Sequence, residues 1–326
     1  MSKKDYTGIR PLNPARDLGQ LADLIENAFG DELSEGGARV LREIRLLSRL
    51  GPLSYLFTGI DQDESIFTGF VWEQDRRVVG NVTVSRPTRH AHKWQISNVA
   101  VLDTYRGQGI GQRLVEAALD MVAQHGGRSA YLFVRDDNPR AIHLYHRLGF
   151  AKVDTTTELK FAAQRASPRP NPLHLLQPLK PAQEHALYEL VRRAVGPGHY
   201  WLYTVRRSQY VLAAEERFFR WLGALVTGEA ELRWGVSEDE TLQAAVILRA
   251  TRLWNLGPHR LQLWIHPNWR DRLAEPLAGD IVSILLAQSR RPTYVSLAAC
   301  EERAAAALLE AGFRHIRTLI LMKLDL

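Results

Sequence analysis

Hydrophobic positions along the first half of the chain follow two periods, one typical of helices and one typical of strands. Apolar residues at helical spacing cover three stretches, at residues 14–29, 33–50 and 110–122. Alternating patterns and short apolar runs predict strands at residues 7–12, 65–74, 77–87, 93–102 and 129–134. Short connections join the strands between residues 65 and 102, so we expect these strands to form an antiparallel meander.

The element boundaries carry residues that usually start and stop helices. Gly126-Gly127 ends one predicted helix, and Asn138-Pro139 supplies a cap and a first-turn proline for the next. Gly149 ends that helix, and a final strand follows it. The order β-α-α-β-β-β-α-β-α-β predicts the α/β class, with a mixed, mostly antiparallel sheet flanked by helices.

The second half of the chain repeats the first half faintly. The segment YVSLAACEERAAAALLEAGF resembles YLFVRDDNPRAIHLYHRLGF, and Trp269-Arg270 matches Tyr105-Arg106 further upstream. A polar, proline-rich stretch at residues 164–172 separates the two halves. We therefore predict two tandem domains of the same fold, at residues 1–163 and 173–326, joined by this linker.

Length and composition agree with two folded domains. The chain has 326 residues, of which 45% are hydrophobic and 24% charged. It contains no run of about 18 apolar residues, so we expect no membrane span, and its first residues lack the apolar core of a secretory signal. Because it also has a single cysteine, we expect a cytoplasmic protein.

The net charge of +6 is compatible with an anionic ligand. The basic residues are scattered along the chain and do not alternate with aromatic residues, so we do not expect nucleic acid as a partner. A phosphorylated small molecule fits this charge equally well.

Three glycines in the stretch YRGQGIGQRL, residues 105–114, mark candidate chemistry. They lie where a strand ends and a helix begins, so the first unpaired N–H groups and the helix dipole favour an anion there. Glycine also leaves room for a phosphate to approach the backbone. The P-loop pattern GxxxxGK[ST] is absent, and the turn follows a meander, which argues against a dinucleotide-binding motif. A glycine-rich turn without a ligand is the alternative.

Two motifs together resemble the GNAT (Gcn5-related N-acetyltransferase) superfamily. The first is R/Q-x-x-G-x-G/A, matched by RGQGIG at residues 106–111, and the second is the spacing of Asn138, Tyr145 and Gly149-Phe150. The resemblance is strong over residues 66–160 and includes the order of elements. It implies binding of acetyl-CoA and direct transfer of its acetyl group to a primary amine of a small-molecule or peptide acceptor, without a metal.

The resemblance also implies a role for each matching residue. The backbone of Val99, Ala100 and Val101 would pair with the pantetheine arm. The residues that would hold the diphosphate are Arg106, Gly107, Gln108, Gly109, Ile110 and Gly111. At the start of the next helix, Asn138 and Ala141 would contact the cofactor. Tyr145 would be the general acid that reprotonates the departing CoA thiolate.

The general base has no obvious candidate in this assignment. An alkylamine with a pKa of about 10.4 is protonated at neutral pH and must lose a proton before it attacks. Many family members carry a Glu on the fourth strand, where this chain has Ser97 beside Asn98. A water held by either side chain could pass the proton to Glu73, His90 or His92. We expect Glu73 to be a surface charge at a strand end and both histidines to be exposed loop residues.

The second half lacks the matching chemistry. At the counterpart of the glycine turn it has Asp271, Leu273 and Glu275, so a bulky side chain and negative charges occupy the place of a phosphate. Glu301 and Leu308 stand where the motif has asparagine and tyrosine. We therefore expect a degenerate repeat with a structural or acceptor-shaping role. Packing of the two domains as a pseudo-dimer is compatible with this role.

Two other functions are compatible with the sequence. Because the usual Glu is missing, the chain could be a non-catalytic protein that binds acyl-CoA or a partner. A transferase that uses a longer acyl-CoA is the second alternative. Neither alternative changes the predicted cofactor site.

Overall fold

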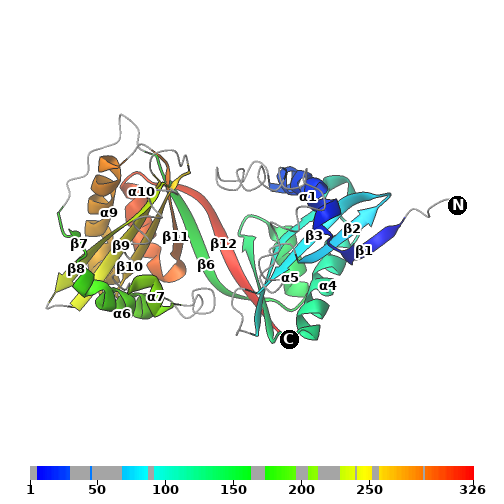
Figure 1. The fold of residues 1–326 in the computed structure, drawn as a ribbon, viewed down its shortest axis with the longest axis horizontal. Helices are drawn as coiled ribbons and strands as arrows, with labels where there is room; N and C mark the ends of the chain where they lie inside the picture. Colours follow the sequence, from blue (N-terminus) through cyan, green and yellow to red (C-terminus); the bar gives the residue numbers. More distant parts are fainter. Residues whose placement is uncertain are drawn as a thin grey trace. The chain divides into compact units, whose positions relative to one another are not determined.

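Figure 1 shows a computed structural model of the chain. The structure describes residues 6–29, 45, 68–86, 92–162, 173–195, 205–211, 228–238, 241–251, 257–288 and 291–326. Apart from Arg45, the predicted helix at residues 33–50 lies outside these ranges, as does the predicted linker at residues 164–172.

The chain divides into two compact units that do not coincide with its two halves. The first unit holds the residues up to Val153 together with Leu321–Leu326, and the second unit holds Asp154–Ile320. Strand β6 (Ala151–Phe161) therefore passes into the second unit soon after it begins, and β12 (Arg314–Asp325) ends in the first unit. Relative to a division at the linker, most of β6 belongs to the second unit and the end of β12 belongs to the first.

The described strands of the first unit follow the order β1-β2-β3-β4-β5, with the end of β12 beside β5. Their bounds are β1 (Thr7–Pro11), β2 (Gly69–Gln74), β3 (Arg77–Ser85), β4 (Lys93–Val101) and β5 (Ser129–Arg135). Strands β1 to β4 pair antiparallel, and the turn Asp75-Arg76 between β2 and β3 has φ angles of 51° and 65°, which suit a tight hairpin. The antiparallel pairing of β2, β3 and β4 confirms the predicted meander. The parallel pairing of β4 and β5 confirms the mixed sheet.

Helices cover both faces of this sheet. They are α1 (Pro14–Phe29), α4 (Ile110–Gln124) and α5 (Pro139–Arg147). Leu24 of α1 packs with Val71 and Ala100. Leu114 of α4 lies so close to Gly80 that a Cβ added there would come within 3.0 Å of it. Val71 pairs with Asn81, so both side chains lie on the face that α1 covers. Neighbouring residues of a strand face opposite sides, so Gly80 and α4 lie on the other face of the sheet (Figure 1).

The second unit has a similar arrangement. Its described strands follow the order β12-β6-β11-β10-β9-β8-β7. The bounds of those not yet introduced are β7 (Gln177–Pro178), β8 (Glu229–Glu238), β9 (Thr241–Thr251), β10 (His259–Ile265) and β11 (Thr293–Ala298). Strands β10 and β11 are parallel, as β4 and β5 are in the first unit.

Helices also cover both faces of the second sheet (Figure 1). They are α6 (Glu184–Ala194), α7 (Arg207–Tyr210), α9 (Arg270–Ala287) and α10 (Glu302–Glu310). Val246 and Leu248 of β9 belong to the core under α9 and α10, whereas Ala245 and Ile247 belong to the core under α6. This alternation of a central strand between two apolar layers is the mixed α/β architecture that the sequence predicts.

Candidate active site

The glycine turn before α4 is open in the way that an anion site requires. Gly107 and Gly109 have φ angles of 82° and 77°, and a Cβ added to either would meet no atom within 4 Å. Gly109 is the N-cap of α4, so no side chain caps the first N–H groups, and no acidic residue lies in the first turn. The helix start therefore presents hydrogen-bond donors and the positive end of its dipole, which fit a phosphate group.

The third glycine and Arg106 contribute to the shape of the turn. A Cβ on Gly111 would lie 3.8 Å from Leu144 and from Val101, which is an ordinary contact distance. Arg106 donates through Nε to the carbonyl of Val101 at 3.1 Å and pairs through Nη2 with Asp103 at 2.7 Å. Since this guanidinium is already engaged, the backbone N–H groups are the main donors to an anion at the turn.

Pairing between β4 and β5 ends before the glycine turn. The register of the two strands covers Lys93–Gln95 of β4, although this strand continues to Val101. The N–H of Leu102 donates to the carbonyl of Val79 on β3 at 2.9 Å. Because N–H groups alternate between the two edges of a strand, those of Val101 and Val99 point toward the β5 side. This edge of β4 offers the groups that the predicted pantetheine contact needs.

Tyr145 lies on α5 with its ring in the core. The residue is 6% exposed, and its ring meets that of Phe150 edge-on, with 5.9 Å between the centroids. Burial raises the pKa of Tyr145 to about 12. The hydroxyl has no hydrogen-bond partner among the described residues, and it is not one of the fully buried unpartnered atoms, so it keeps some contact with solvent. The phenol is therefore a neutral donor at physiological pH.

The start of α5 confirms the predicted cap. Asn138 Oδ1 accepts a hydrogen bond from the N–H of Ala141 at 3.1 Å, and Pro139 lies in the first turn. These two polar groups therefore satisfy each other. Asn138 Nδ2 and the Ala141 side chain are left for the predicted contacts with a cofactor.

Ser97 and Asn98 lie at a bulge in β4. Thr83 of β3 pairs with Ser97, and Asn81 pairs with Ala100, so β4 has one residue more than β3 between these pairs. Asn98 has a φ of 51°, and its Nδ2 lies 3.3 Å from Thr83 Oγ1. Neither Ser97 nor Asn98 is a base. The sequence patterns do not predict that Asn81 and Thr83 contact this bulge. An asparagine inside the apolar run VVGNVTV is the signal that could have indicated it.

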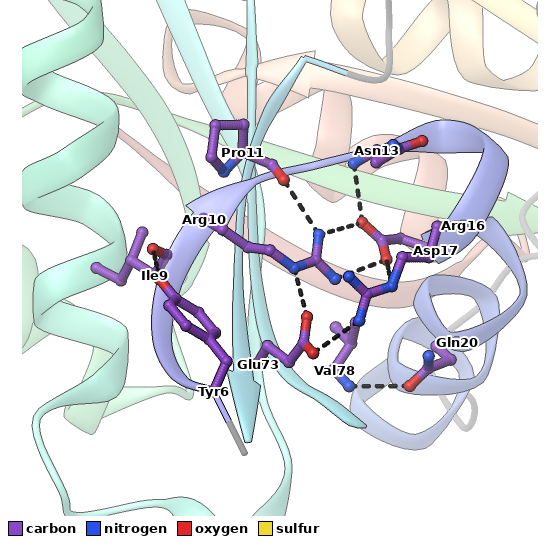
Figure 2. A network of polar contacts seen from close by, with 10 residues as sticks. All are labelled: Tyr6, Ile9, Arg10, Pro11, Asn13, Arg16, Asp17, Gln20, Glu73 and Val78. Atoms are coloured by element: carbon purple, nitrogen blue, oxygen red, sulfur yellow. Dashed lines mark hydrogen bonds and ion pairs between the residues drawn. The ribbon is translucent and has the colours of Figure 1, made fainter. Parts of the chain in front are cut away.

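Glu73 is not the surface charge that the sequence predicts. It is 3% exposed and accepts hydrogen bonds from Arg10 and Arg16, the latter at 2.7 Å (Figure 2). Arg10 also donates to both carboxylate oxygens of Asp17, at 2.6 and 2.8 Å. Burial alone would raise the pKa of Glu73, but the two guanidinium groups lower it below its usual value. The prediction was wrong because β1 and α1, distant in sequence, supply these cations, and the paired carboxylate is unsuited to act as a base.

The histidines supply no base beside the bulge. His92 is exposed, as predicted, and its Nδ1 lies 2.9 Å from the carbonyl oxygen of Gly126. It lies just before Lys93, the first residue of β4, whereas Ser97 lies in the middle of the strand. His90 lies outside the described residues.

The part of the chain that the structure describes contains no group of three or more His, Cys, Asp or Glu side chains that could hold a metal ion. None of its helices combines the length and the apolar character needed to cross a membrane.

Comparison with known proteins matches the region that contains the glycine turn to a protein family. The profile of the Acetyltransferase (GNAT) family matches residues 39–150, which include β2 to β5, α4 and α5. The chain belongs to the GNAT superfamily. The matched region carries an acetyltransferase domain, and it contains the glycine turn before α4.

Curated relatives match parts of this GNAT domain. The N-alpha-acetyltransferase of Sulfurisphaera tokodaii is 30% identical over 112 residues, which are 31% of this chain and 66% of that protein. The N-alpha-acetyltransferase RimI of Mycobacterium tuberculosis is 36% identical over 77 residues, 23% of this chain and 47% of that protein. A mycothiol acetyltransferase of Kocuria rhizophila is 27% identical over 146 residues, 44% and 46% of the two chains. The chain thus matches about two thirds or less of each relative's length.

Solved GNAT structures share the fold over nearly the whole chain. A GCN5-related N-acetyltransferase from Sphaerobacter thermophilus superposes with a TM-score of 0.64 at 17% identity and covers 97% of this chain and 95% of its own. A tandem GNAT protein from the clavulanic acid biosynthesis pathway gives a TM-score of 0.59 at 15% identity, with 98% of each chain covered. At these identities the likeness shows the fold, which is a tandem GNAT arrangement.

The second unit has no open turn at the counterpart of the GNAT cradle. Helix α9 begins at Arg270, and no residue from 266 to 275, all of which the structure describes, has a positive φ. Leu273 is 7% exposed and belongs to the core. Arg270 donates to Glu301 Oε1 at 3.0 Å and to the carbonyl of Ala194 at 2.9 Å. The first turn of α9 therefore stands where the first unit has glycines, and Arg270, the counterpart of Arg106, is held in an internal ion pair.

Replacing Glu301 by Gln is expected to stabilise the protein above pH 7. Burial raises the pKa of Glu301 to about 7, although Arg270 opposes this shift, and its Oε2 is buried without a partner. A raised pKa means that the folded state favours the neutral acid, so stability falls as the pH rises from about 4.5 to about 7. Glutamine imitates the neutral acid, so we expect a gain of about 1–3 kcal/mol at pH 8 and a smaller one at pH 5.

Denaturant unfolding of both proteins at the two pH values measures this difference. Glu302→Gln, at the next and exposed position, is the control and should change little. Lower stability of Glu301→Gln at pH 8 would instead show that the ion pair with Arg270 is stabilising.

Proposed function

We propose that the first unit is the catalytic unit of an N-acetyltransferase that uses acetyl-CoA and a primary amine. The observation that carries the proposal is the turn at Gly107 and Gly109, where two left-handed glycines leave open space beside the uncapped start of α4. The diphosphate of a CoA donor fits such a turn. The matched family supports acetyl transfer, and relatives named N-alpha-acetyltransferase support an amine as the acceptor.

In this proposal the donor is bound largely by backbone groups of the chain. The N–H groups from Gln108 to Gly111 bind the diphosphate, and those of Val99 and Val101 bind the pantetheine arm. Acetyl-CoA supplies a thioester whose carbonyl carbon is the electrophile. The Val101 N–H polarises that carbonyl and stabilises the negative charge that develops on its oxygen. Asn138 Nδ2 contacts the cofactor from the start of α5.

The amine must reach the thioester without its proton. The carboxylate of Glu73 is engaged by Arg10 and Arg16, which leaves it unsuited to this step. A water held by Ser97 or Asn98 at the bulge passes the proton to solvent in this proposal. Attack by the neutral amine then expels the CoA thiolate, and Tyr145 donates a proton to its sulfur. The proton that the nitrogen loses as the amide forms leaves through solvent, from which Tyr145 regains its own.

Replacing Tyr145 by Phe is expected to lower kcat by about 100-fold and to change the Kd for acetyl-CoA less than twofold. The phenol acts on the departing thiolate, whereas the backbone groups hold the donor. Because the pKa of Tyr145 is about 12, we expect no loss of kcat from its ionisation below about pH 11. Release of the CoA thiol measures kcat, and calorimetry measures Kd. Tyr105→Phe, next to the glycine turn, should leave both unchanged; an unchanged kcat in Tyr145→Phe removes Tyr145 from the mechanism.

The reaction class is tested by CoA release from the full chain with a panel of amines. A peptide with a free N-terminus and a small alkylamine represent the two acceptor classes, and acetyl-CoA is compared with a longer acyl-CoA. Turnover with acetyl-CoA supports the proposal. Binding of acetyl-CoA without turnover of any amine would favour a non-catalytic acyl-CoA-binding protein, and preference for the longer donor would favour the other alternative.

We infer that the second unit binds no acetyl-CoA and has a structural role. The regular start of α9 and the buried Leu273 support this inference. A calorimetric titration should therefore give one molecule of acetyl-CoA per chain.

A further inference from the structure

The bulge in β4 requires hydrogen-bond partners that a regular ladder would supply. Asn98 and Val99 together stand opposite the single residue Val82, between the pairs Thr83–Ser97 and Asn81–Ala100. An extra residue of this kind interrupts the ladder and leaves backbone groups unpaired. Asn98 is exposed and Val99 is half-buried, but the Asn98 carbonyl is turned toward the buried side chain of Asn81, so a side chain is the partner available to it within the protein.

Asn81 supplies the missing partner. Its Nδ2 donates to the backbone carbonyl of Asn98 at 3.0 Å and lies 3.4 Å from Thr83 Oγ1. Asn98 Nδ2 reaches the same hydroxyl at 3.3 Å, so the three side chains form one closed network on the bulge. These bonds also fix the orientation of the Asn81 amide, because the opposite orientation would place Oδ1 against the Asn98 carbonyl.

The surroundings of Asn81 are those of a core position. Its neighbours across the sheet are Val71 on β2 and Ala100 on β4, which pack with Leu24 of α1. Asn81 is 0% exposed, and its Oδ1 is buried without a partner. An apolar residue would avoid this unpaired oxygen but would leave the Asn98 carbonyl without its donor, so the bulge explains the asparagine better than core packing does.

The bulge determines which way the later N–H groups of β4 point. N–H groups alternate between the two edges of a strand, so one extra residue reverses their direction for every residue that follows. With the bulge in place, Leu102 donates to β3, and Val101 points toward the β5 side. Asn98 adopts a φ of 51° at this position, a conformation that asparagine tolerates better than most residues.

We propose that Asn81, together with Thr83, is a positioning residue that holds the β4 bulge and thereby aims the Val99 and Val101 N–H groups at the acyl donor. The proposal rests on the proposed function, because the donor is acetyl-CoA. Asn81 acts through the backbone of β4 and touches no substrate.

Asn81→Leu tests this role, because leucine has a similar size and removes both polar atoms. We expect the Kd for acetyl-CoA to rise about tenfold, which corresponds to about 1.4 kcal/mol. The thermal midpoint is expected to fall only slightly, because the variant loses the donor to the Asn98 carbonyl but also loses the unpaired Oδ1. A crystal structure of the variant without ligand should show Asn98 away from its φ of 51° and the Val99 and Val101 N–H groups turned from their wild-type directions.

Two variants of Thr83 provide a milder pair. Thr83→Val removes Oγ1 at nearly constant volume and should raise Kd by about threefold, an effect in the range expected for one hydrogen bond. Thr83→Ser keeps the hydroxyl and should bind acetyl-CoA as the wild type does. If Asn81→Leu does not fold, this pair decides the question in its place.

The outcomes separate this proposal from the proposed function. The positioning role is overturned if Asn81→Leu retains the bulge and its Kd for acetyl-CoA is unchanged. If the leucine variant does not fold, equal Kd values for Thr83→Val and Thr83→Ser overturn it instead. A large loss of thermal stability with unchanged Kd overturns it too and makes Asn81 merely structural. If the wild type binds no acetyl-CoA, the proposed function fails, and so does the claim that the Val99 and Val101 N–H groups point at an acyl donor. The crystal structure of the variant still shows whether Asn81 holds the bulge.

Discussion

Gly109→Glu is expected to abolish detectable binding of acetyl-CoA, with a loss of at least about 100-fold, or 2.7 kcal/mol. Gly109 has a φ of 77°, which costs about 1–2 kcal/mol for a residue with a Cβ. The new side chain also enters the space that is empty beside the turn. Its carboxylate would stand next to the diphosphate, and two like charges about 4 Å apart repel by up to about 4 kcal/mol near a protein surface. Calorimetric titration with acetyl-CoA measures the loss.

Two matched variants separate these contributions. Gly109→Ala adds the strain without the charge, so we expect a weakening of about tenfold or less. Gln108→Glu adds a negative charge at an exposed position that does not require glycine, so it should weaken binding of acetyl-CoA. Arg272→Glu adds the same charge at the corresponding position of α9 and should leave binding of acetyl-CoA unchanged. Wild-type affinity in Gly109→Glu would exclude the turn as the diphosphate site.

Removal of Leu321–Leu326 is expected to unfold the first unit and abolish acetyl-CoA binding. These residues belong to the first unit, where the N–H of Leu326 donates to the carbonyl of Arg128 at 2.9 Å. Leu321 and Met322 are fully buried, and loss of one such side chain typically costs about 2–5 kcal/mol. Two losses of this size approach the whole stability of a typical domain.

Thermal unfolding and calorimetry with acetyl-CoA measure this effect on the truncated chain. Removal of Leu326 alone is the control, because this residue is exposed and its loss takes away one backbone hydrogen bond. A fragment of residues 1–163 that folds and binds acetyl-CoA with wild-type affinity would contradict the shared-strand arrangement. It would instead support two independent domains divided at the linker.

Local signals in the sequence predict much of the first unit. Left-handed glycines and an Asn-Pro cap depend on a few neighbouring residues, so the glycine turn and the start of α5 are readable directly. The antiparallel meander is readable as well, because tight turns such as Asp75-Arg76 connect its strands. These features locate the candidate donor site.

Features that depend on distant partners are not readable in this way. The apolar pattern of β12 specifies a strand but not which sheet edge it joins, so its place beside β5 does not follow from the sequence. The bulge shifts the alternation of β4 by one residue within a run that looks continuous. Glu73 becomes buried because Arg10 and Arg16 cover it from β1 and α1, more than fifty residues away.

The central claim is that acetyl-CoA binds to the first unit, at the glycine turn and the free edge of β4. Hydrogen–deuterium exchange of the full chain, with and without saturating acetyl-CoA, tests it most directly. We predict slower exchange at the amides of residues 99–101 and 107–112, and no change at residues 269–275 of the second unit. Protection at residues 269–275, or unchanged exchange at residues 107–112 with the ligand bound, would contradict the claim.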